Sequence, residues 1–314
     1  MKKNYNRRSF IKSSGLLGSA LLFAGSILPE NIFSRSSAKK PALSVVSGTD
    51  YFNNTIKSVE LLGGMKRFVK KRSKAGLLIN SDFDTFPAYT SPDVAIAVLK
   101  MCFDAGASEV STLQNVKPEY WQRSQHYETH KNLIDNIVNL EFNQFPSKFD
   151  EENFVNLEVP GVSLKRAEVI KKLFDVDVLI NIPVAKHHGS TIYTGALKNM
   201  MGISTRKTNV GMHLDSGVRN DPDYLAQCIV DLNQLRIADL TITDATEVLT
   251  SNGPMGPGDT IKPLKIVAGT DMVAVDSYCC NLLGHRIGEV LTLVKAEKAG
   301  IGTMDFNKLS IKTA

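Results

Sequence analysis

Basic side chains gather where a short apolar run of this chain ends. Residues 176–183 form the run, and Lys186, His187 and His188 follow it. A run of this kind is typical of a strand buried on both faces, and ligands of open α/β sheets bind where such strands end. Since imidazole titrates near neutral pH, His187 or His188 suits a general base or a metal ligand.

A second set of polar groups follows within ten residues. A helix beginning near Thr194 would place its hydroxyl and the Lys198 ammonium on one helix face. With free N–H groups at the helix start they would bind an anion. We therefore expect a small anionic ligand at this site, with His187, Lys198 and Asp276 as catalytic residues. The expected binding residues are Lys186, Thr194, Gly195, Asn199, Asn252, Gly253 and Asp271.

Each assignment has a structural alternative. Lys198 could be an ordinary solvent-exposed helix lysine, and one histidine could merely close the strand. Asn252 and Gly253 lie in a turn-rich stretch that could be purely structural, and Asp271 stands where a helix N-cap is expected. Asp276 lies inside an apolar helical segment, where a carboxylate needs a partner or a cleft.

A metal is a further expectation. His213 and Asp215 stand two residues apart, and with His187 they would offer two nitrogens and one oxygen to a divalent metal. A surface loop is the alternative for this pair. Asp244 and Glu247 follow another predicted strand, and either bind metal, act as an acid–base pair or cap the chain. The four cysteines form no CxxC motif, so we expect buried free thiols and no iron–sulfur cluster.

Apolar runs alternate with helical patterns along the chain. We predict strands at residues 42–46, 76–80, 109–113, 176–183, 239–244 and 264–268. Helices are predicted at residues 92–106, 128–140, 222–235, 271–283 and 289–299. The alternation predicts an α/β fold with a mainly parallel sheet and helices on both faces. Residues 39–314 are expected to form a single α/β domain, in which residues 114–160 are an insertion or a lid.

The N-terminus carries an export pattern. Arg7 and Arg8 are followed by Ser9, Phe10, Ile11 and Lys12, then by an apolar stretch at residues 15–28. This order resembles a twin-arginine signal, and the small residues 36–38 suit cleavage after Ala38. We expect residues 1–38 to engage the twin-arginine export machinery and the chain to be periplasmic or otherwise extracytoplasmic. An uncleaved membrane anchor is the alternative.

The net charge of +5 belongs to this N-terminal segment. Without residues 1–38, basic and acidic residues are equal in number at 31 each. A protein body without excess positive charge is not expected to bind nucleic acid, nor to stay on a membrane after cleavage.

Several motifs resemble those of a family of unknown function. They are Lys186-His187, the stretch from Thr194 to Asn199 with Gly202, Asn252-Gly253-Pro254, Gly269-Thr270-Asp271 and Ala274-Val275-Asp276. In this order they resemble the domain-of-unknown-function 362 family over residues 75–302. The family has no settled activity. Some members carry a ferredoxin-like iron–sulfur segment, which this chain and its cysteines do not match.

A shorter resemblance concerns the nickel-dependent lactate racemase group. His187, Thr194-Gly195, Lys198 and Gly202 follow the order of that group's site. The resemblance implies a lysine that helps to hold a nucleotide-derived nickel cofactor, and histidines that ligate metal or transfer protons. The group's other motifs are not evident in this chain.

Two functions follow from these patterns. The first is an exported enzyme that acts on a small anionic molecule with a bound metal or cofactor. The second is a non-catalytic periplasmic ligand-binding or assembly protein.

Export through the twin-arginine machinery depends on the arginine pair. We expect the double variant Arg7→Lys with Arg8→Lys to leave uncleaved precursor in the cytoplasm, because the pair is the recognised element. Fractionation followed by immunoblotting measures this. Normal processing and export of the double variant would show that the segment is not a twin-arginine signal.

Overall fold

A computed structural model describes residues 42–142 and 148–314, so the predicted export signal lies outside the described residues. These residues form a seven-stranded sheet in the order β13-β1-β12-β9-β6-β2-β3. The four strands β9 (Leu240–Ala245), β6 (Val178–Ile182), β2 (Lys74–Ile79) and β3 (Glu109–Thr112) are mutually parallel. β12 (Lys265–Gly269) runs antiparallel to β9 and β1 (Ala42–Ser47), and β13 (Ser310–Thr313) is parallel to β1.

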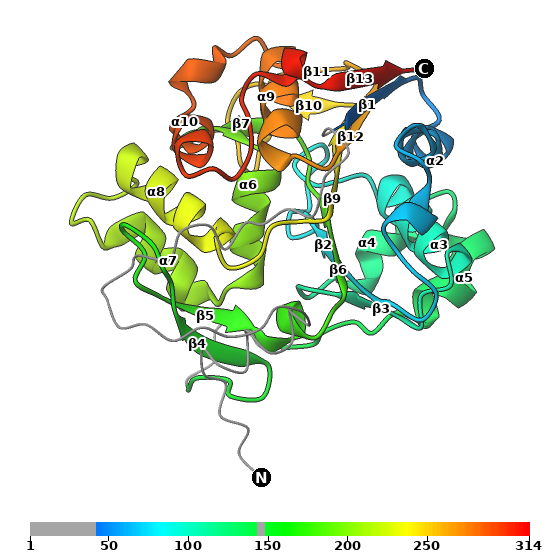
Figure 1. Cartoon of the computed structure of the whole chain (residues 1–314), viewed down its shortest axis with the longest axis horizontal. Coiled ribbons are helices and arrows are strands. Elements are labelled where there is room, and N and C mark those ends of the chain that lie inside the picture. The colour runs from blue at the N-terminus through cyan, green and yellow to red at the C-terminus, as the bar shows by residue number, and fades with distance from the viewer. Residues whose placement is uncertain (1–41, 143–147) are drawn as a thin grey trace, which may run out of the picture. The chain divides into compact units, whose positions relative to one another are not determined.

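Helices cover both faces of this sheet (Figure 1). On one face, α2 (Tyr51–Leu61) and α3 (Pro92–Asp104) share a hydrophobic cluster with Leu77 of β2. On the other face, α8 (Pro222–Asn233), α9 (Met272–Leu282) and α10 (Leu291–Lys298) share a second cluster with Leu78. Because successive strand residues point to opposite faces, the apolar run of β2 supplies both clusters. The predicted α/β class with a mainly parallel sheet is confirmed.

The six predicted strands are all present, with ends shifted by one or two residues. The sequence reading missed β13 and three two-stranded ribbons: β4 (Phe154–Glu158) with β5 (Arg166–Ile170), β7 (Lys186–His188) with β8 (Ile192–Thr194), and β10 (Val248–Leu249) with β11 (Thr260–Ile261). These strands are two to five residues long, too short to show a clear period. The four cysteines are buried free thiols, as expected.

Residues 114–160, expected as an insertion or lid, contain α4 (Pro118–Gln122), α5 (Tyr127–Asp135) and β4. α4 and α5 pack against α3 on one side of the sheet. The helix predicted to reach residue 140 ends at Asp135, because Val138 then forms a parallel bridge with Ser111 and extends the sheet edge. Among the described residues, no helix is long and apolar enough to cross a bilayer.

Candidate functional site: a cationic cluster at one edge of the sheet

The parallel strands β2, β6 and β9 all end at the same edge of the sheet. The chain leaves β6 through Pro183, whose carbonyl accepts the N–H of Asp244 at the end of β9 (2.9 Å), and then enters the β7–β8 hairpin. Asp82 and Phe83 follow β2 at this edge. Lys186–His188 therefore lie beyond the buried strand β6, as the sequence predicts.

The hairpin sorts these side chains onto two faces. Lys186 pairs with Thr194, His187 with Tyr193, and His188 with Ile192. Since side chains alternate along a strand, Lys186, His188 and Thr194 share one face while His187 lies on the other. Thr194 thus faces the site from a strand, and not from the helix on which the sequence placed it.

Lys186 is a fully buried lysine. Its ammonium donates a hydrogen bond to the carbonyl oxygen of Ala88 and lies 4.1 Å from the centre of the Phe83 ring. Burial and, after it, the positive charge of Lys198 lower the pKa of Lys186 to about 7, against the attraction of Asp82. Directly across the hairpin, the hydroxyl of Thr194 is buried and has no hydrogen-bond partner among the described residues.

Lys198 lies at the end of α6 (Ala196–Asn199) and is partly buried. Within the part of the chain that the structure describes, its ammonium donates only to the sulfur of Met201 (3.5 Å), which is a weak acceptor. Burial lowers the pKa of Lys198 to about 8. The charge of Lys198 in turn lowers the pKa values of His188 and His213, although burial contributes more to both.

His188 and His213 each make hydrogen bonds through Nδ1. Nδ1 of His188 accepts the N–H groups of Ser190 (3.1 Å) and Thr191 (3.3 Å), so the proton of the neutral ring is on Nε2. His213, in α7 (Arg206–Leu214), bonds through Nδ1 to Oδ1 of Asn220 at 2.8 Å. We call Lys186, His188, Thr194, Lys198 and His213 the cationic cluster, after the two lysines that supply its positive charge.

Asp276 holds the short helix that carries Lys198. Its two carboxylate oxygens accept the N–H groups of Ala196 (2.6 Å) and Leu197 (2.9 Å), and the Tyr193 hydroxyl lies 3.4 Å away. A Cβ on Gly195 would come within 2.2 Å of Asp276, so only glycine admits this carboxylate. The N–H groups expected to bind an anion are therefore already bonded, and Asp276 is a positioning residue.

Asn199 also serves the frame of the site. Its amide donates to the carbonyl of Leu78 (3.1 Å) and to Oδ1 of Asn181 (2.8 Å), while Asn181 donates to the carbonyl of Ala196 (2.8 Å). These bonds join α6 to the centre of the sheet. Both of these hydrogen bonds use the NH₂ group of Asn199, so its predicted role in ligand binding has no free donor.

His187 contacts the turn-rich loop at Asn252 and Gly253, outside the cationic cluster. Its Nδ1 accepts the N–H of Gly253 (3.1 Å), and a Cβ on Gly253 would meet the His187 carbonyl oxygen at 1.8 Å. The turn-rich loop thus lies against the hairpin as expected. The side chain of Asn252, however, is exposed and donates to Pro257 of its own loop (3.3 Å).

Asp271 is not at this edge. β12 runs antiparallel to β9, so Gly269 pairs with Thr241 near the start of β9, and the residues after β12 emerge at the opposite edge. The expectation that the loop after residue 268 joins the site is wrong for this reason. Asp271 caps α9 by accepting the N–H groups of Val273 (3.0 Å) and Ala274 (3.1 Å).

The predicted metal ligands do not come together. Among the residues that the structure describes, no three His, Cys, Asp or Glu side chains form a metal-binding group. Nδ1 of His187 is already bonded, and Asp215 is an exposed residue at the end of α7. Asp244 binds the N–H of Ser91 (2.7 Å), and Glu247 pairs with Lys262 (3.1 Å).

The sequence did not predict Phe83 and Ala88, which contact Lys186, or Asp82, whose charge attracts it. The signal was present, because they follow β2 at the same edge where Lys186 follows β6. Residues 80–91 contain no histidine or lysine, so their sequence alone does not predict a site.

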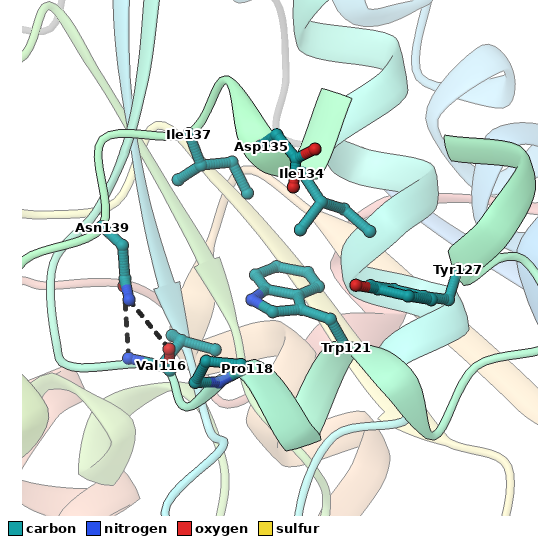
Figure 2. Close-up of a pocket in the computed structure, with 8 residues that line it drawn as sticks. All are labelled: Val116, Pro118, Trp121, Tyr127, Ile134, Asp135, Ile137 and Asn139. Carbon is teal, nitrogen blue, oxygen red and sulfur yellow. Dashed lines mark hydrogen bonds between the residues drawn. The ribbon is translucent and has the colours of Figure 1, made fainter. Parts of the chain in front are cut away.

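A separate pocket of about 160 Å³ lies among α4, α5 and the chain after α5 (Figure 2). Trp121, Tyr127 and Ile134 face one another across it, while Asn139 is bonded to the backbone of Val116. It is smaller than the ~300–1,000 Å³ usual for small-molecule sites. None of its lining residues belongs to the cationic cluster.

The chain belongs to the family described as "Domain of unknown function (DUF362)", whose model matches residues 77–281. This confirms the family resemblance drawn from the motifs. A thylakoid-associated protein of Synechocystis sp. is 25% identical over 251 residues, which cover 77% of this chain and 73% of that protein.

Two solved structures are similar at low identity. The lactate racemase apoprotein of Thermoanaerobacterium thermosaccharolyticum matches with 11% identity and a TM-score of 0.42, over 63% of this chain and 49% of that one. A protein from Thermotoga maritima matches with 15% identity and a TM-score of 0.45, over 76% and 60%. The chain thus spans less than two thirds of either structure.

Asp276 makes stability depend on pH. Burial raises its pKa from 3.8 to about 7, so the folded chain binds this proton more tightly than the unfolded chain does. The free energy of unfolding of the wild type, relative to Asp276→Asn, should therefore fall as pH rises from about 4 to about 7, by up to about 1.4 kcal/mol per pH unit. Urea unfolding at a series of pH values measures this. A difference between the two proteins that does not change with pH would contradict the assignment.

Proposed function

We propose that this chain binds a small anionic ligand at the cationic cluster and acts on it as an enzyme outside the cytoplasm. The observation that carries the proposal is the balance of charge around Lys186 and Lys198. Two ammonium groups lie close enough for Lys198 to lower the pKa of Lys186. Asp82 is the carboxylate that attracts Lys186, whereas Asp244 and Asp276 bind backbone N–H groups. An anion would supply the missing negative charge.

Donors are available for such a ligand. Among residues 42–142 and 148–314, the Thr194 hydroxyl has no partner and Lys198 donates only to a sulfur, while Nε2 of His188 carries a proton. Charge-assisted hydrogen bonds to a carboxylate or phosphate are stronger than those between neutral groups. The cluster therefore offers an anion several donors.

The main alternative is a binding protein without catalysis. One observation favours it: the buried carboxylates of Asp244 and Asp276 accept backbone N–H groups, so neither is free to act as a base. Loss of turnover with retained ligand binding in a site variant would favour the enzyme. Ligand binding without any turnover would favour the binding protein.

Location and partners remain part of the proposal. The N-terminal motif supports export by the twin-arginine machinery, and the even charge of residues 39–314 supports a body that binds neither nucleic acid nor membrane. The name of the Synechocystis relative describes association with thylakoids, which are membranes, so vesicle binding by the mature chain deserves a direct assay. A metal is not part of the proposed mechanism, because the predicted ligands are not assembled among the described residues.

Lys198 provides the test of anion binding. Lys198→Met keeps the apolar stem and removes the ammonium, so affinity should fall about tenfold to a hundredfold, as expected for a charge-assisted bond of roughly 1.5–3 kcal/mol. Lys198→Arg should restore only part of this affinity. Calorimetric titration of the mature chain with lactate, pyruvate and inorganic phosphate is the measurement.

Lys207→Met is the matched control, because Lys207 lies on α7, is exposed and pairs with Glu168 (2.9 Å). It should leave affinity unchanged, and thermal melts should show all variants folded. If none of the three anions binds the wild type, or if Lys198→Met binds as the wild type does, the proposed site is wrong.

A further inference from the structure

Lys186 has surroundings that anion binding alone does not explain. A lysine that only attracts an anion works best when charged and hydrated. Lys186 is instead fully buried, with one neutral oxygen as its hydrogen-bond acceptor and an aromatic ring 4.1 Å away. The ammonium of Lys198 adds a repulsive charge. Desolvation and a second cation are the two conditions that turn a lysine into a nucleophilic amine.

We propose that the Nζ of Lys186 forms an imine with the carbonyl carbon of a small anionic ligand, of the 2-oxo acid or aldehyde acid class. The inference rests on the proposed function, since the cationic cluster must first hold the ligand's anionic group. It adds the reaction that the ligand undergoes and the atom that reacts.

The step balances without an oxidant or reductant. The lone pair of Nζ attacks the carbonyl carbon, forming the C–N bond and breaking the π bond of the carbonyl. The resulting carbinolamine loses its oxygen as water, which carries away the two protons of the amine. The product is a C=N bond between Lys186 and the ligand. A pKa of about 7 supports this step, because about half of the amine is then unprotonated at neutral pH.

The ligand class follows from what surrounds Nζ. Thr194 faces Lys186 across the hairpin, and its buried hydroxyl lacks a partner. Lys198 supplies a nearby positive charge. A carboxylate next to the carbonyl would meet these two groups while its neighbouring carbon meets Nζ.

Access to Lys186 requires movement of the segment after β2. Its later part is fixed, since the Thr90 hydroxyl donates to the Ile182 carbonyl (2.9 Å) and the Ser91 N–H to Asp244 (2.7 Å). Its tip is exposed at Asp84 and Phe86. A ligand would take the places of the Phe83 ring and the Ala88 carbonyl beside Nζ.

Reductive trapping tests the proposal. The mature chain is incubated with pyruvate and sodium cyanoborohydride, and its intact mass is measured. A trapped imine adds the mass of pyruvic acid less one oxygen atom, and peptide mapping should locate the label at Lys186. Lactate, which has no carbonyl, should add nothing. Labelling should become faster as pH rises through about 7, as the amine loses its proton.

Lys186→Arg keeps the charge and should abolish the label, whereas Lys207→Arg on exposed α7 should retain it. Mapping of the wild type gives the answer even if Lys186→Arg does not fold. Binding of pyruvate and lactate without label at Lys186, or label spread over exposed lysines, would overturn the imine and leave the anion site intact. If neither acid binds and no label forms at Lys186, the imine proposal fails, and the anion site fails with it when inorganic phosphate does not bind either.

Discussion

The carboxylate of Asp276 is the contact on which the site depends. It lies in α9, far along the chain from the hairpin, and binds two successive N–H groups at the start of α6. Because a four-residue helix does not form in isolation, this cap and the bonds of Asn199 to the sheet are what fix Lys198.

The same arrangement explains why the surrounding carboxylates do not neutralise the lysines. Asp244 and Asp276 are buried and bind backbone N–H groups, which leaves Asp82 as the carboxylate that attracts Lys186. Their hydrogen bonds fix the frame of the protein, while burial raises the pKa of both carboxyl groups. Lys186 and Lys198 are left with a carbonyl and a thioether as hydrogen-bond acceptors, so both ammonium groups are easier to deprotonate than usual. Because Asp244 and Asp276 bind backbone N–H groups and not the lysines, the site favours binding of an anion from solution.

The sequence predicted the main elements but not all of their directions. The long strands are continuously apolar and the helices carry apolar residues at helical spacing, so the sequence predicts both. The direction of β12 depends on its pairing with β9 and leaves no trace in composition, so Asp271 was assigned to the wrong edge. The four-residue spacing of Thr194 and Lys198 predicts that both lie on one helix. Gly195 is the N-cap of α6, however, so Thr194 lies in the preceding strand. Lys186 was expected in the site, but its burial under Phe83 and Ala88 requires a contact between segments that only the fold brings together.

The central claim, that the sheet edge beyond β6 holds an anion, is tested most directly by anomalous diffraction from crystals of the mature chain soaked in sodium selenate. The account predicts a selenium peak within hydrogen-bond distance of the Thr194 hydroxyl and of the Nζ of Lys186 or Lys198. Peaks confined to exposed basic residues such as Lys66, Lys70 and Lys71, with none at the cationic cluster, would contradict it.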